Sequence, residues 1–168
     1  MKQSLGITLA AAALVASATG LATSQTMMAS PAPGMMATMP AEADFVRAVQ
    51  QSNDEEIAAA RFILRSTKNP AVMAFATQMI DDHSTSDVSL QTASRNAHVP
   101  IPQRMRLGMV PPMLQGMMGR QLDAAYMQQQ VDAHGMALAV LTTEATSGKS
   151  PSLKAFASAQ ASVVSSHL

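Results

Sequence analysis

At 168 residues, the chain has room for one domain and a targeting segment. Its 11 Lys and Arg balance 11 Asp and Glu, so the formal net charge is zero, and no basic stripe indicates a nucleic-acid partner. The absence of cysteine excludes disulfides, thiol catalysis and iron–sulfur clusters. Aromatic residues make up only 3%, whereas Ala, Leu, Gln and Met are abundant, which favours helices over a β-sandwich.

Residues 1–24 have the pattern of a secretory signal peptide. Lys2 provides a positive start, residues 5–18 form an apolar run, and small residues follow up to Ser24. A spanning helix needs about 20 apolar residues, so the shorter run favours a cleaved signal over a membrane anchor. We expect cleavage after Ser24 or Ala18, delivery to the periplasm or secretion, and no transmembrane segment in the mature chain.

Residues 25–40 are rich in Met, Pro and Ala without periodicity, which predicts a flexible leader before a bundle domain over 41–168. In that domain, apolar residues recur at three- and four-residue steps over 41–67, which predicts a first helix. Asn69-Pro70 then interrupts the pattern. Asn is a good N-cap and Pro suits the first helical position, so a second helix is expected over 70–96.

Residues 98–119 form a connection rich in Pro and Met, with at most a short helix near 113–118. A third helix is predicted over 120–146. Ser150-Pro151 repeats the cap-then-proline start, and a fourth helix is expected from there to the end of the chain. Two helical hairpins joined by a long link predict an all-α, four-helix bundle.

Each predicted helix has an apolar stripe that should face the core. The stripe residues are Phe45, Val49, Ala59 and Ile63; Val72, Phe75, Met79 and Leu90; Leu122, Leu138 and Leu141; and Leu153, Phe156 and Val163 or Val164.

One polar, ionisable residue interrupts each stripe: Glu56, His83, His134 and His167. Burying such groups costs several kcal/mol unless they are paired or bind a metal. Glu56 lies 14 residues before Pro70 and His83 lies 13 after it, so the two are nearly level in their hairpin.

In the second hairpin the two residues are again nearly level, because His134 lies 17 residues before Pro151 and His167 lies 16 after it. The levels of the two hairpins differ by only about 4.5 Å, at about 1.5 Å per residue. One carboxylate and three imidazoles at one level predict a site for a divalent transition metal. Asp82, Tyr126 and Gln130 are expected to hold the ligands in place. The alternative is a structural polar cluster without metal. Since helix ends fray, His167 is expected to be the weakest member.

Short segments of the chain carry a recognisable pattern: Met79-Ile-Asp-Asp-His83, Asp123-Ala-Ala-Tyr126 and Gln130-Val-Asp-Ala-His134. Together with Glu56 and His167-Leu, they resemble the bacterial exported family called domain of unknown function 4142, over 43–168. The resemblance implies a ferritin-like four-helix bundle and export, and it implies no known activity.

The chain departs from the family at Leu122, where Phe is usual, and it stops right after His167. A ferritin-like di-iron site needs Glu-x-x-His on two helices. Here Ile80 and Val131 occupy the glutamate positions, so a di-iron oxidase is not expected and no catalytic residue is assigned.

The methionines suggest a further soft-metal hypothesis, since thioethers favour Cu(I). Five of them lie in 27–39 and five in 105–118; the alternative is adaptable apolar surface. The leading hypothesis is an exported bundle that binds a transition metal for metal handling or envelope stress protection. The second is a non-catalytic envelope interaction protein without a metal.

Overall fold

The computed structural model describes residues 42–103 and 109–168, which contain four α-helices and no strand. The elements are α1 (Glu42–Leu64), α2 (Pro70–Asn96), the short 3-10 helix η2 (Pro112–Leu114), α3 (Gly119–Ser147) and α4 (Pro151–Ser166). The predicted all-α fold is therefore confirmed. The predicted signal peptide (1–24) and leader (25–40) lie outside the described residues.

The two proline-led helix starts have the predicted caps. The Asn69 side chain accepts a hydrogen bond from the Ala71 amide at 3.0 Å. The Ser150 hydroxyl accepts one from the Leu153 amide at 3.5 Å, and a proline follows each cap. Such caps satisfy amides that the first helical turn leaves unpaired, which explains why both helices begin where the sequence predicts.

Three predicted elements differ from the structure by two residues or more, while the third helix is one residue longer at each end than predicted. The first helix ends at Leu64 rather than Thr67, because the next amides turn to carbonyls three residues back: Arg65 donates to Phe62 and Ser66 to Ile63. Within the turn that follows, the Thr67 hydroxyl accepts a hydrogen bond from the Asn69 amide. The expected short helix over 113–118 is replaced by η2, and Gly116, with φ of 79°, does not continue a helix. The last helix stops at Ser166 rather than at the chain end.

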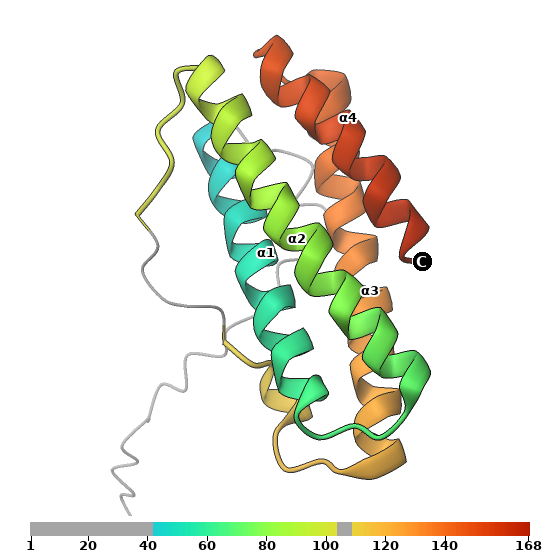
Figure 1. Cartoon of the computed structure of the whole chain (residues 1–168). Helices are drawn as coiled ribbons and strands as arrows, with labels where there is room; N and C mark the ends of the chain where they lie inside the picture. Colours follow the sequence, from blue (N-terminus) through green and yellow to red (C-terminus); the bar gives the residue numbers. More distant parts are fainter. Residues whose placement is uncertain (1–41, 104–108) are drawn as a thin grey trace, which may run out of the picture. The chain divides into compact units, whose positions relative to one another are not determined.

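The helices pack as two hairpins, α1 with α2 and α3 with α4, and these form a bundle in which α2 also packs on α4 and α1 on α3 (Figure 1). The end of α2 and the beginning of α3 lie at opposite ends of the bundle (Figure 1). The link between them must therefore return over the length of the bundle. One such long crossover is the connection found in ferritin-like bundles.

The apolar core is divided into two clusters. The Phe45 cluster contains Phe45, Val46, Val49, Leu90, Ala93, Leu141, Leu153, Phe156, Ala157 and Val164. The Tyr126 cluster contains Ala59, Ala60, Ile63, Val72, Ala76, Met79, Leu114, Leu122 and Tyr126. Along the helices, buried polar residues separate the two clusters, and we call them the polar layer: Asn53, Glu56, His83, Ser86, Asp87, Gln130 and His134.

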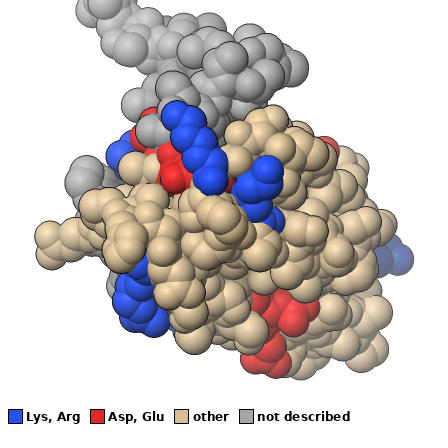
Figure 2. Space-filling view, turned by 90° about the horizontal axis from the view of Figure 1, so that it is seen from above, with Lys and Arg blue, Asp and Glu red and all other residues tan. Residues whose placement is uncertain are grey.

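The surface view in Figure 2 looks at one end of the molecule. On this face, some of the described Lys and Arg residues lie beside Asp or Glu, and they form no continuous basic patch. Within residues 42–103 and 109–168, none of the helices combines the length and apolar character that a membrane-spanning helix requires.

The aromatic residues of the predicted stripes differ in burial. Phe45 is 1% exposed and meets Phe156 edge to face, with ring centroids 6.2 Å apart. Phe75 is only half-buried, and the neighbouring Ala76 occupies the fully buried position instead. Phe45 therefore contributes more buried apolar area than Phe75.

We predict that Phe45→Ala lowers the free energy of unfolding by about 3–5 kcal/mol, because it leaves a cavity in a closed part of the core. Phe75→Ala, at a half-buried position, should cost less than about 2 kcal/mol. Urea denaturation of the two variants beside the wild type measures both values. Equal losses would contradict the assignment of the core.

Candidate metal centre

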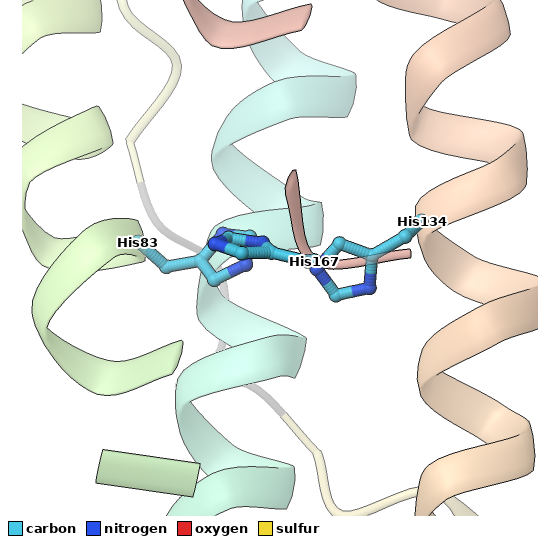
Figure 3. Close-up of side chains that lie close together, drawn as sticks. All are labelled: His83, His134 and His167. Atoms are coloured by element: carbon cyan, nitrogen blue, oxygen red, sulfur yellow. The ribbon is translucent and has the colours of Figure 1, made fainter. Parts of the chain in front are cut away.

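Three histidines from different helices converge in the bundle. His83 lies on α2, His134 lies on α3, and His167 is the residue that caps the end of α4; their rings point toward one another (Figure 3). One ring nitrogen of each lies within 4.8 Å of those of the other two. The ring centroids are 5.0 to 6.0 Å apart, so the rings are in contact without a hydrogen bond between them.

One nitrogen of each ring is held by a hydrogen-bond acceptor. His83 Nδ1 lies 3.0 Å from Asn53 Oδ1, and His134 Nδ1 lies 2.8 Å from the Gln130 backbone carbonyl. His167 Nε2 lies 2.9 Å from Asp82 Oδ2. Because each partner accepts, these nitrogens carry the protons, and the other nitrogen of each neutral ring presents a lone pair.

A second hydrogen bond decides which end of the Asn53 amide faces His83. The Asn53 Nδ2 group donates to Asp87 Oδ1 at 2.8 Å and to Ser86 Oγ at 3.2 Å. Its oxygen is therefore directed at the imidazole. This arrangement sets the position of the proton on His83, as acceptors commonly do for metal-binding histidines.

The remaining nitrogens are His83 Nε2, His134 Nε2 and His167 Nδ1. All three are buried and have no hydrogen-bond partner among the residues that the structure describes. Buried polar atoms are almost always satisfied, and leaving one unpaired costs about 1–3 kcal/mol. Three rings that meet in the core, each with one unpaired nitrogen, are a donor set that a transition metal would satisfy.

The surroundings keep two of the rings uncharged. Burial, followed by the neighbouring His134 and His167, lowers the pKa of His83 to about 4, against the opposing charge of Asp82. Burial also lowers the pKa of His134, although its hydrogen bond to the Gln130 carbonyl opposes the shift. Since only a neutral imidazole binds a metal, both shifts favour the ligand form at neutral pH.

The predicted fourth ligand, Glu56, does not belong to the group of ligand atoms within 4.8 Å of one another. Its buried carboxylate accepts hydrogen bonds from Gln130 Nε2 at 2.5 Å and from Gln129 Nε2 at 3.4 Å. Burial raises the pKa of Glu56 to about 7, although these hydrogen bonds oppose the shift. The structure thus brings three of the four predicted residues together and places Glu56 beside them, across Gln130.

The three residues expected to support the site have different places. Asp82 accepts from His167, and Gln130 contacts both Glu56 and His134. Tyr126 meets the Phe75 ring edge to face, with centroids 6.2 Å apart, and burial, followed by the charge of Glu56, raises its pKa. The Tyr126 hydroxyl has no hydrogen-bond partner within the described part of the chain.

Sequence reasoning missed Asn53, which is the α1 residue that contacts the His83 imidazole. It lies one helical turn before Glu56, on the same face. The available signal was the polar amide of Asn53, which lies on the same helix face as Glu56 and one turn before it. Counting residues from the helix-starting proline pointed to Glu56, but such a count could not decide between Asn53 and Glu56, which share one face.

The expectation that His167 is the weakest member is not supported by its surroundings. Its side chain is only 1% exposed. The ring is held by Asp82 and lies edge to face with Phe75, with centroids 6.4 Å apart. Its amide closes the last turn on the Val164 carbonyl at 3.2 Å. Tertiary contacts therefore hold this helix end.

The link methionines that the structure describes do not share one environment. Met117 packs against the Tyr126 cluster, whereas Met109, Met113 and Met118 are exposed. The other methionines named for the Cu(I) hypothesis, in 27–39 and at 105, lie outside the described residues.

The raised pKa of Glu56 predicts a pH-dependent stability. The folded state holds the proton more tightly than the unfolded chain, where the pKa is near 4.5, so stability is lost as the pH rises through about 7. The loss should be on the order of 3 kcal/mol. Glu56→Gln should remove it, and urea denaturation of chelator-treated protein between about pH 5 and pH 8 measures the difference.

His83 also contributes to the pH dependence of stability. Because it is present in both proteins, the difference in unfolding free energy between Glu56→Gln and the wild type at each pH cancels its contribution. That contribution has the opposite sign, because stability is lost as the pH falls from 6.5 through about 4. Glu55→Gln, at an exposed neighbouring position, is the control. An unchanged pH profile in the Glu56 variant would contradict the prediction.

Comparison with known proteins assigns the chain to a family. A search of curated proteins and a search of solved structures gave no significant match. The family model described as "Domain of unknown function (DUF4142)" matches residues 24–168, which include every residue of the bundle and of the histidine group. The chain therefore belongs to the DUF4142 family.

Proposed function

We propose that this protein binds one divalent transition metal ion in its core, through imidazole nitrogens of His83, His134 and His167. Two observations carry the proposal: each of the three rings has a buried nitrogen without a partner among the described residues, and one ring nitrogen of each lies within 4.8 Å of those of the other two. Each opposite ring nitrogen is already held by an acceptor, so the lone pairs are oriented before a metal arrives.

The chemistry of the donor set narrows the choice of ion. Three neutral imidazoles suit zinc, copper, nickel or ferrous iron rather than magnesium or calcium, which prefer oxygen. Because these imidazoles carry no negative charge, they do not compensate the charge of the ion. In a tetrahedral shell a fourth ligand, from solvent or from a bound molecule, would complete the coordination.

The role that fits this site best is metal handling or protection of the cell envelope against metal stress. A di-iron oxidase would need several carboxylates around two ions. The group found among the described residues contains only imidazoles. Binding and release of a single ion needs no further catalytic group. The alternative, an envelope interaction protein in which the polar layer is purely structural, predicts no metal binding.

Calorimetric titration of chelator-treated protein with Zn²⁺, Cu²⁺, Ni²⁺ and, without oxygen, Fe²⁺ tests the proposal. We expect at least one ion to bind in a ratio of one per chain. His83→Ala, His134→Ala and His167→Ala should each weaken binding by more than about 100-fold, since loss of a ligand exceeds loss of a supporting group. His98→Asn is the control, because His98 is exposed with φ of 55°, which Asn tolerates.

The supporting hydrogen bonds are tested in the same titration. Asp82→Ala removes the acceptor for His167 and should weaken binding by about 10–100-fold. Asp81→Ala changes the exposed neighbouring aspartate and should have little effect. Equal affinities in these two variants, or tight binding that survives in the His83→Ala/His134→Ala double variant, would refute the site. No binding of any ion would favour the interaction protein.

We also propose that the protein acts outside the cytoplasm, in the periplasm or after secretion. The support is the positive start, apolar run and small residues of 1–24. Mass spectrometry of the protein from its native cells should find an N-terminus near Gln25 or Thr19. A mature protein that retains Met1 would contradict export by cleavage.

A further inference from the structure

A cleft of about 730 Å³ lies between α1 and α3, beside residues 109–112 of the link. This size is typical of sites for small organic molecules. Glu56 and His83 contribute to its lining, so the cleft reaches the polar layer of the core. Met109 and Met136, which are largely exposed, also line it.

The cleft is polar at the level of the polar layer and mainly apolar farther along the bundle, where Gln160 also belongs to its lining. Asn53, Glu56 and Gln129 line it at the level of the polar layer. Farther along the bundle its walls belong to the Phe45 cluster, with Val49, Leu141 and Val164. On α1, Glu56 and Ala48 both line the cleft and are eight residues apart, or about 12 Å along the helix axis. A ligand that fits would therefore have a polar head and an aliphatic chain.

The charge of the head follows from the side chains at the polar end. Among the described residues that line the cleft, the charged ones are Glu55 and Glu56, and none is Lys or Arg. Glu56 is 3% exposed, its hydrogen bonds come from two neutral amides, and it forms no ion pair with any described residue. A buried carboxylate without a cation is costly, and a ligand cation would compensate it.

We propose that this cleft binds an aliphatic amine, with its ammonium group at the Glu56 carboxylate and its chain along the apolar end. An ammonium has three donors and no acceptor, which matches a carboxylate that has only two amide donors. A carboxylate head would meet Glu56 as a like charge. An alcohol would leave the charge of Glu56 uncompensated. The proposal does not require the metal, because the residues that carry it are outside the histidine group.

Titration of chelator-treated protein with octylamine at pH 8 tests the proposal. Octylamine should bind at least about tenfold more tightly than octanol or octanoate, because only the ammonium gains a charged hydrogen bond. Methylamine, which lacks the chain, should also bind at least about tenfold more weakly. Octanoate or octanol binding as tightly as octylamine would overturn the charge assignment.

Two pairs of variants locate the site. Glu56→Gln keeps the shape and removes the charge, and it should weaken octylamine binding at least about tenfold while octanol binding stays unchanged. Glu55→Gln, at the exposed glutamate, is its control. Ala48→Phe combined with Ala137→Phe should fill the cleft and abolish binding, whereas Ala139→Phe, exposed and outside the lining, should not.

Circular dichroism and thermal melting first establish that each variant is folded. Unchanged octylamine affinity in folded Glu56→Gln, or in the folded cleft-filling variant, would refute the site. The metal titration is a separate measurement on the same wild-type protein. Amine binding without metal binding, or the reverse, would therefore show which of the two proposals fails.

Discussion

The buried polar layer is the constraint on which the rest of this structure depends. It crosses the bundle between the Phe45 and Tyr126 clusters, where its side chains are largely removed from water. Each member must therefore find its partner within the protein, or leave a polar atom unpaired at a cost of about 1–3 kcal/mol. The hydrogen bonds of Asn53 and Gln130 satisfy many of these groups, and together with the bond between Asp82 and His167 they orient the imidazoles.

Gln130 connects the two chemical features of the layer. Its backbone carbonyl accepts from His134, while its side-chain amide donates to Glu56. Gln130 therefore links the imidazole group to Glu56, which lines the cleft. The imidazole group and Glu56 differ in their electrostatics. The imidazole group is a set of nitrogen donors suited to a cation with open coordination positions, and burial lowers the pKa of His83 and of His134. Glu56 is a buried acid whose burial favours its protonated form or a cationic partner.

Local sequence signals predicted the fold well because they act over a few residues. The Asn69-Pro70 and Ser150-Pro151 starts, and stripes repeated every three or four residues, suffice to predict helices and their inner faces. These signals were less accurate where the local backbone conformation ends a helix although the spacing of apolar residues continues. Gly116 and the Thr67 turn ended helices that the pattern would have continued, and Phe75 shares its buried face with the smaller Ala76.

The sequence by itself determined that ionisable residues interrupt every apolar stripe, and level matching brought His83, His134 and His167 to one height. Only the tertiary structure decided what each contacts. A stripe covers a broad arc of the helix, so Asn53 and Glu56 occupy the same face, yet Asn53 meets His83 and Glu56 meets Gln130. The tertiary structure also decided the burial of His167, because Asp82 and Phe75, distant in sequence, hold a helix end that would fray in isolation.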